Sequence, residues 1–153
     1  MSVVAWDGKI LAADRMGMFS DTIRTIQKLW KLSNGEVVAV VGPISTGLLV
    51  KEWYEAGANR KELPECQKTD EWAQLIVASK DGCFYYDSQP VQIKVMDPFC
   101  AWGIGREVAL GAMEMGGDAV KAVEIASKHV SGCGRGCDYV NTKSDSEQKL
   151  NKG

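Results

Sequence analysis

Histidine is almost missing from this sequence, and so are the motifs of several large enzyme classes. The chain has 153 residues and one histidine, His129, so a Ser-His-Asp triad has a single candidate base and no motif to support it. There is no GxSxG nucleophile elbow, no GxxxxGKS/T phosphate loop and no GxGxxG run. The sequence therefore gives no support for an α/β-hydrolase, a P-loop NTPase or a dinucleotide-binding fold.

Long apolar runs are also lacking. No stretch approaches the ~20 apolar residues of a membrane span, and the N-terminus has no signal-peptide pattern. A net charge of −2 gives no sign of a nucleic-acid partner. We therefore expect a cytoplasmic protein that binds neither membrane nor nucleic acid.

The cysteine count is odd, which disfavours a disulfide framework in a chain with no secretion signal. The five cysteines are Cys66, Cys83, Cys100, Cys133 and Cys137. The run CGRGC at 133–137 has no second cysteine pair to complete a metal site. We expect free thiols, and the sequence predicts no metal and no cofactor.

Length and composition predict one domain, because domains usually hold ~100–200 residues. Hydrophobic residues make up 45% of the chain and charged residues 25%, which is ordinary for a globular protein. We expect a domain over residues 1–143 and a polar, frayed tail over residues 144–153.

Three hairpins are predicted from Asp-Gly and Asn-Gly pairs, which accept the positive φ of tight turns. Their strands are Val3–Trp6 with Lys9–Ala13, Lys28–Ser33 with Val37–Val41, and Trp72–Ser79 with Cys83–Asp87. Further strands are expected at Val91–Val95, Pro98–Trp102 and Asp138–Thr142.

Three helices are predicted from apolar spacing: Pro43–Gly57, Arg106–Met115 and one from the Asp118 N-cap to about His129. Clustered hairpins need helices to cover their faces. The order of elements predicts an α/β (α+β) domain of two stacked antiparallel sheets with helices outside.

One nucleophilic mechanism needs no histidine. A serine, threonine or cysteine at the chain terminus can use its own α-amine as general base, because that amine titrates near ~7.7–8.0. Ser2 occupies this place once Met1 is removed. Serine at position 2 is common in proteins of every class, so it does not identify an enzyme by itself.

The run SVVAWDGKILAADR resembles the opening of proteasome β-type subunits, and more closely the small proteasome-like proteins of bacteria and phages. These belong to the N-terminal-nucleophile (Ntn) hydrolases. Ala12-Ala13-Asp14 matches the strand end that carries their catalytic aspartate, and Lys28 matches their catalytic lysine. Gly42 matches their oxyanion glycine. The resemblance continues through Gly103-Ile104-Gly105-Arg106 and the two following helices, and it spans roughly residues 2–142.

The resemblance implies a four-layer αββα sandwich. It also implies a threonine-type endopeptidase subunit that cleaves peptide or protein substrates through Ser2, Asp14, Lys28 and Gly42. A homo-oligomeric ring and an ATP-dependent unfoldase partner are further implications.

The sequence departs from the family pattern at several polar positions. The nucleophile is serine in place of the usual threonine. Ile104, Val130 and Cys133 occupy positions where the family has serine, aspartate and serine. Residues 58–71 are short for the family's second helix. Two alternatives therefore stay open: a catalytically silent assembly or binding module, and an Ntn amidase that acts on a small molecule.

Overall fold

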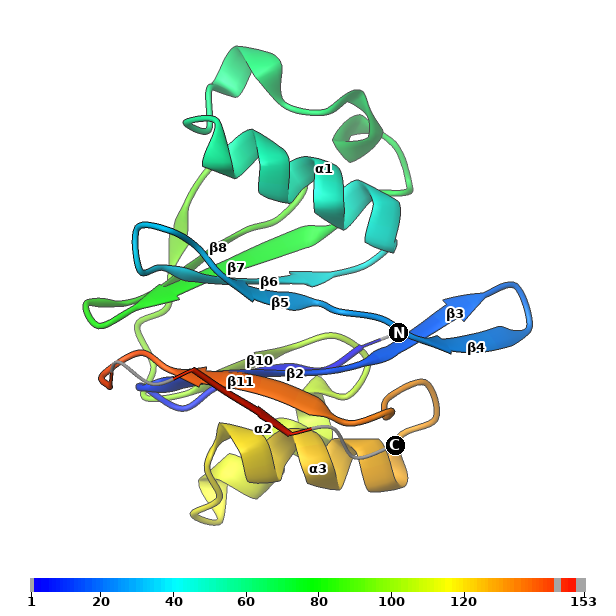
Figure 1. Ribbon diagram of the computed structural model, residues 1–153, viewed down its shortest axis with the longest axis vertical. Coiled ribbons are helices and arrows are strands. Elements are labelled where there is room, and N and C mark those ends of the chain that lie inside the picture. Colours follow the sequence, from blue (N-terminus) through cyan, green and yellow to red (C-terminus); the bar gives the residue numbers. More distant parts are fainter. Residues whose placement is uncertain (1, 145–146, 151–153) are drawn as a thin grey trace.

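Two five-stranded antiparallel sheets stack face to face in the computed structural model, with helices on both outer faces (Figure 1). The structure describes residues 2–144 and 147–150. The first sheet has the order β10 (Cys100–Trp102), β1 (Val4–Trp6), β2 (Ile10–Asp14), β11 (Cys137–Asn141), β12 (Glu147–Leu150). The second has the order β5 (Leu29–Lys31), β6 (Val37–Val41), β7 (Gln74–Ser79), β8 (Gly82–Tyr86), β9 (Ile93–Lys94).

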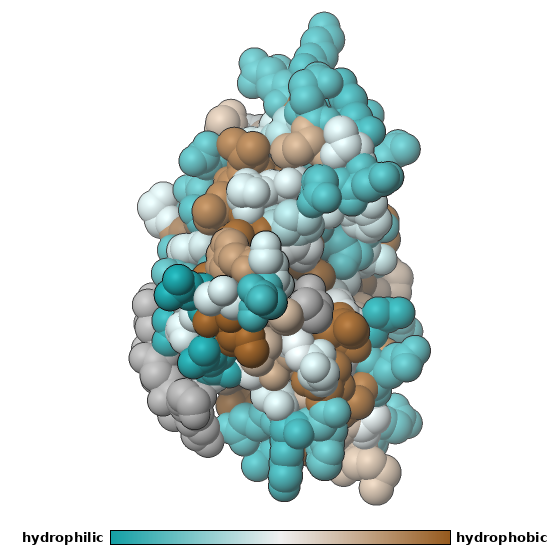
Figure 2. Space-filling view, turned by 90° about the vertical axis from the view of Figure 1, so that its right-hand side faces the viewer, coloured by the Kyte–Doolittle hydropathy of each residue, from teal (hydrophilic) through white to brown (hydrophobic). Residues whose placement is uncertain are grey.

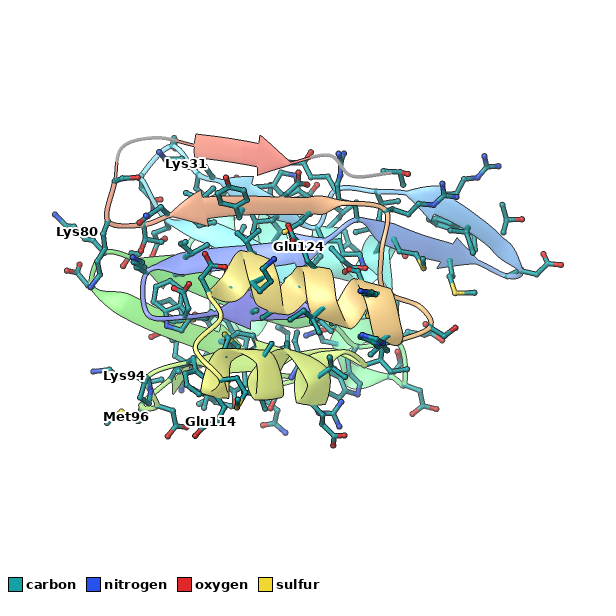
Figure 3. The ribbon with its side chains drawn as sticks, turned by 90° about the horizontal axis from the view of Figure 1, so that it is seen from below. Lys31, Lys80, Lys94, Met96, Glu114 and Glu124 are labelled. Carbon is teal, nitrogen blue, oxygen red and sulfur yellow. The ribbon has the colours of Figure 1, made fainter. Side chains whose placement is uncertain are left out.

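The helices form the two outer layers. Helix α1 (Ile44–Glu55) packs on β6 and β7 of the second sheet. Helices α2 (Arg106–Glu114) and α3 (Ala119–His129) lie together across β1 and β2 when the molecule is seen from below (Figure 3). The predicted four-layer αββα sandwich is confirmed.

Both faces of the first sheet are buried, so β1 and the first four residues of β2 are apolar at every position. Ala5 and Ala12 pack toward α2 and α3. Val4 and Leu11 point the other way and pack against the second sheet. This alternation is the period of two that a strand imposes on its side chains.

The first hairpin also anchors the helical layer. The Asp7 carboxylate accepts hydrogen bonds from the backbone N–H groups of Lys9 and Ile10 within the turn, and from Ala119 at the start of α3. Asp118 caps α3, as the sequence predicts, by accepting from the N–H of Lys121 at 2.8 Å. These bonds fix α3 over β1 and β2, where it covers the start of the chain.

The three predicted hairpins and three predicted helices are all present, with ends shifted by a few residues. A fourth hairpin, β3 (Met16–Phe19) with β4 (Thr22–Thr25), is a difference from the sequence analysis. Its turn contains Ser20, which adopts a φ of 60° without being glycine. The turn therefore carries none of the Asp-Gly or Asn-Gly signals that reveal the other hairpins.

The C-terminal residues differ from the expectation of a frayed tail. Residues 144–153 were expected to fray, but Glu147–Leu150 forms β12 and pairs with β11. The reason is that β11 would otherwise present an unpaired edge of N–H and C=O groups. Residues 145–146 and 151–153 of the expected tail lie outside the described residues.

Residues 58–71 contain two short 3-10 helices, Arg60–Glu62 and Glu65–Lys68, in place of a full second helix. The outer layer on the second sheet is reduced accordingly. No helix in the described part of the chain is both long enough and apolar enough to cross a membrane.

Candidate active site

Ser2 lies two residues before β1, at the edge of a cavity. It is 2% exposed, and its carbonyl accepts a hydrogen bond from the N–H of Gly105 at 3.1 Å. The cavity has a volume of about 360 Å³, and Lys28 and Gly42 line it together with Ser2. Three residues that are far apart in the sequence therefore share one cavity.

Asp14, the last residue of β2, is fully buried and accepts four hydrogen bonds. Its Oδ1 accepts from the N–H of Val3 at 3.1 Å and from Lys28 Nζ at 2.7 Å. Its Oδ2 accepts from the N–H groups of Met16 at 3.3 Å and Gly134 at 3.0 Å. These four donors form a cradle that satisfies both oxygens of the buried carboxylate.

Lys28 comes directly before β5 and is 3% exposed. Its carbonyl accepts from the N–H of Val40 on the neighbouring strand, and its ammonium forms the ion pair with Asp14. A buried ammonium needs a partner of opposite charge. Because Asp14 also holds Val3, the residue next to Ser2, the ion pair places the Lys28 cation beside the start of the chain.

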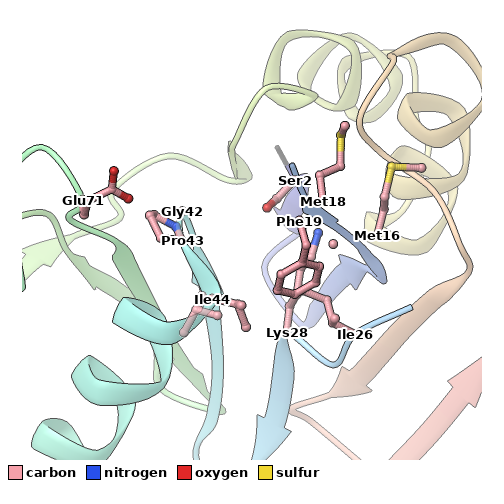
Figure 4. Close-up of a pocket in the computed structure, with 12 residues that line it drawn as sticks. Ser2, Met16, Met18, Phe19, Ile26, Lys28, Gly42, Pro43, Ile44 and Glu71 are labelled. Atoms are coloured by element: carbon pink, nitrogen blue, oxygen red, sulfur yellow. The ribbon is translucent and has the colours of Figure 1, made fainter. Parts of the chain in front are cut away.

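Gly42 follows β6 and has a φ of +120°. A Cβ at this position would lie 3.0 Å from both the Ala73 Cα and the Trp72 carbonyl oxygen. The conformation and the close approach of the backbone both require glycine. Figure 4 shows Gly42 and Ser2 on facing sides of the cavity.

The Gly103–Gly105 loop lies against the nucleophile candidate. Gly103 has a φ of +94°, and a Cβ there would collide with the backbone of Ser2. Gly105 packs against Val3 and the Cys133 thiol. Ile104, between the two glycines, is 52% exposed.

Cys133 is buried beside the same loop. Burial, followed by the negative charge of Asp14, raises the pKa of the Cys133 thiol to about 11. The thiol is therefore protonated at neutral pH and is a poor nucleophile, because the thiolate is the reactive form. Val130, at the C-terminal end of α3, is partly buried and packs against the core between α3 and the first sheet.

The structure thus brings Ser2, Asp14, Lys28 and Gly42 to one end of the two sheets. Their catalytic roles stay predictions. The five cysteines are free, and no cluster of three or more His, Cys, Asp or Glu that could hold a metal occurs among residues 2–144 and 147–150.

Two walls of the cavity consist of residues that the sequence did not indicate as part of a site. One wall is apolar and comes from the β3–β4 hairpin and the residue after it: Met16, Gly17, Met18, Phe19 and Ile26. The other includes Glu71, in the irregular segment before β7. Alternation around Ser20-Asp21 could have indicated the hairpin. No local pattern marks Glu71.

Comparisons with known proteins bear on this arrangement. No protein-family profile matches the sequence, and no curated protein sequence matches it. Solved structures do match. BPH from Thiobacillus denitrificans in complex with epoxomicin superposes with a TM-score of 0.72 at 16% identity, covering 94% of this chain and 100% of that chain.

A second structure of the same protein, Thiobacillus denitrificans BPH, gives a TM-score of 0.71 at 18% identity and covers 95% of this chain and 100% of that one. Eukaryotic HslV from Trypanosoma brucei gives 0.67 at 20% identity and covers 91% and 97%. Structural similarity at sequence identities of 16–20% establishes the fold. The chain therefore has the proteasome-like fold of the Ntn hydrolases, over nearly its whole length.

Proposed function

We propose that this chain is a subunit of a proteasome-like Ntn peptidase that cleaves peptide bonds through Ser2 after Met1 is removed. The observation that carries the proposal is the buried Lys28–Asp14 ion pair beside the cavity. The N–H of Val3 donates to Asp14, so the pair lies next to the start of the chain. An α-amine can serve as general base without histidine, and here the start of the chain, a buried cation and a cavity meet.

In the proposed reaction, Ser2 Oγ attacks the substrate carbonyl and its proton passes to the freed α-amine of Ser2. The nearby Lys28 ammonium favours the neutral, basic form of that amine, because like charges disfavour a second protonation. The Gly42 N–H stabilises the negative oxygen of the tetrahedral intermediate. The C–N bond breaks as the amine returns its proton to the leaving nitrogen, and water then hydrolyses the seryl ester.

The first test is covalent labelling. Epoxomicin is an epoxyketone peptide, so its ketone can take a hydroxyl and its epoxide can take an amine on the same residue. Since one structure of the same fold is an epoxomicin complex, we expect intact mass to show one inhibitor per chain, mapped to residue 2. Ser2→Ala and a Met1-retaining sample should stay unlabelled. Equal labelling of Ser2→Ala would overturn the proposal.

Assembly is part of the proposal. The β3–β4 hairpin forms a two-stranded sheet of its own, separate from the two large sheets, and exposes Met18, Phe19 and Ile23. Apolar side chains gather around the middle of this end of the molecule (Figure 2). A two-stranded hairpin is marginally stable in water by itself, so a self-assembled ring that covers it would stabilise it.

We therefore expect light scattering at micromolar concentration to report a homo-oligomer larger than the 16.7 kDa chain. The exposed apolar side chains and five tryptophans in 153 residues are the reason. A single 16.7 kDa species would contradict ring assembly. An ATP-dependent unfoldase as partner belongs to the same proposal.

The second candidate function is a catalytically silent assembly module. It is favoured by Ile104, which is exposed next to Ser2 and can neither donate nor accept a hydrogen bond with its side chain. A chain without supporting polar groups can keep the fold and lose the chemistry. Failure of both epoxomicin labelling and peptide cleavage in a processed sample would favour this candidate.

A further inference from the structure

Glu71 is the one carboxylate that lines the cavity apart from the ion-paired site. The Asp14 charge is balanced by Lys28 and three backbone N–H groups. The Glu71 side chain forms no ion pair or side-chain hydrogen bond within the described part of the chain. A ligand in the cavity therefore meets one charge that is not already paired, the negative charge of Glu71.

The segment that carries Glu71 is held in place. The N–H of Glu71 donates to the Thr69 hydroxyl at 3.1 Å. Two residues further on, Ala73 is clamped by the buried amide of Gln67, which accepts from its N–H at 2.7 Å and donates to its carbonyl at 2.9 Å. Trp72, between them, brings its carbonyl to within contact of Gly42. Glu71 is thus fixed next to the candidate oxyanion glycine.

The opposite wall has different chemistry. Met16, Met18, Phe19 and Ile26 provide a thioether, aromatic and aliphatic surface with no charge. In Figure 4, Glu71 lies on the Gly42 side of the cavity, while the two methionines lie beyond Ser2 on the other side. A peptide whose carbonyl reaches Ser2 and Gly42 must therefore contact an apolar wall in one direction and a carboxylate in the other.

We propose that Glu71 selects peptides with a lysine or arginine on its side of the scissile bond, paired with a large apolar side chain on the hairpin side. This inference rests on the proposed peptidase function for its catalytic readout. The physical basis is charge complementarity at the Glu71 end and apolar burial against the hairpin at the other. Glu71 is exposed, so its contribution is that of a surface ion pair.

The experiment compares three internally quenched peptides that differ at one position, which carries lysine, the neutral isostere norleucine, or glutamate. Each has leucine on the other side of the central bond, and each is made in both orders. A surface pair contributes ~0.2–1 kcal/mol, so we expect kcat/KM about 1.4- to fivefold higher for lysine than for norleucine in one of the two orders. Glu71→Gln should remove this preference, and Glu71→Lys should transfer it to the glutamate peptide.

Glu62→Gln is the matched control. Glu62 is also an exposed carboxylate in the segment before β7, but it does not line the cavity. This variant should keep the parent's preference. Raising the salt concentration should weaken the preference in the parent, because exposed charges are screened.

A binding measurement separates this inference from the proposed function. Fluorescence anisotropy of the labelled peptides on Ser2→Ala requires no turnover. Tighter binding of the lysine peptide that disappears on Glu71→Gln supports the selection even if the parent cleaves nothing, in which case the peptidase proposal alone fails. Cleavage by the parent with equal rates for lysine and norleucine overturns the role of Glu71 and leaves the peptidase proposal standing. Equal binding of the two peptides to Ser2→Ala also overturns it.

Discussion

Asp14→Asn is expected to destabilise the protein by about 3–5 kcal/mol, because it leaves the buried Lys28 ammonium without its carboxylate. The substitution also turns one acceptor oxygen into an NH₂ donor. Each oxygen of Asp14 accepts two donors, so in either amide orientation the NH₂ faces donors in place of an acceptor. Chemical denaturation followed by tryptophan fluorescence measures the loss.

Lys28→Met is the informative control. It removes the cation and keeps a chain of similar length, while the Asp14 carboxylate retains the N–H groups of Val3, Met16 and Gly134. We expect this variant to lose less than half as much stability as Asp14→Asn. The double variant should be more stable than Asp14→Asn alone, because it no longer buries a cation without its carboxylate. Equal losses in the two single variants would contradict this account of the cradle.

Ser2→Ala is expected to lower peptide cleavage by at least about 10³-fold, because no other hydroxyl and no thiol lines the cavity among the residues that the structure describes. Cys133 is the closest rival, and the raised pKa of its thiol keeps it protonated at neutral pH. Retention of Met1 should have an equally large effect, because it converts the Ser2 amine into an amide that cannot act as a base. The measurement is single-turnover cleavage of a fluorogenic peptide, with intact mass confirming the state of residue 1.

Two further variants sharpen this prediction. Ser2→Thr keeps a hydroxyl and adds a methyl group that restricts χ1, so it should stay active. Ile104→Ser places a hydroxyl at an exposed position in the loop whose Gly103 contacts the backbone of Ser2, so it should raise the rate with little effect on stability. The parent should be slow, since one oriented donor at an acyl-transfer site contributes on the order of 10²–10³ in kcat. If Ser2→Ala cleaves as fast as the parent, Ser2 is not the nucleophile.

The hairpins show which turns a local sequence pattern can predict. Asp7-Gly8, Asn34-Gly35 and Asp81-Gly82 each predict a turn that the structure contains, because positive φ is a property of the turn itself. Ser20 adopts the same kind of conformation without a glycine signal, and its hairpin went unpredicted. That hairpin forms the apolar wall of the cavity, so its absence hid part of the site.

The tail shows a limit of a different kind. Polar residues 144–153 resemble a disordered terminus in composition, yet Glu147–Leu150 pairs with β11. Pairing of an edge strand depends on backbone groups that every residue carries. Composition alone therefore could not predict β12.

The sequence by itself determined three hairpins and three helices and, through its resemblance to a known family, the identity of the candidate nucleophile, aspartate and lysine. Apolar periodicity, turn residues and the Asp118 cap are local properties of the chain. Only the tertiary structure decided that these groups meet. Asp14 reaches Val3 and Lys28 across 11 and 14 residues and Gly134 across 120, and Glu71 enters the cavity because Gln67 and Gly42 fix the segment around it. Contacts of this kind follow from how strands pair and layers stack, and a local sequence pattern does not encode them.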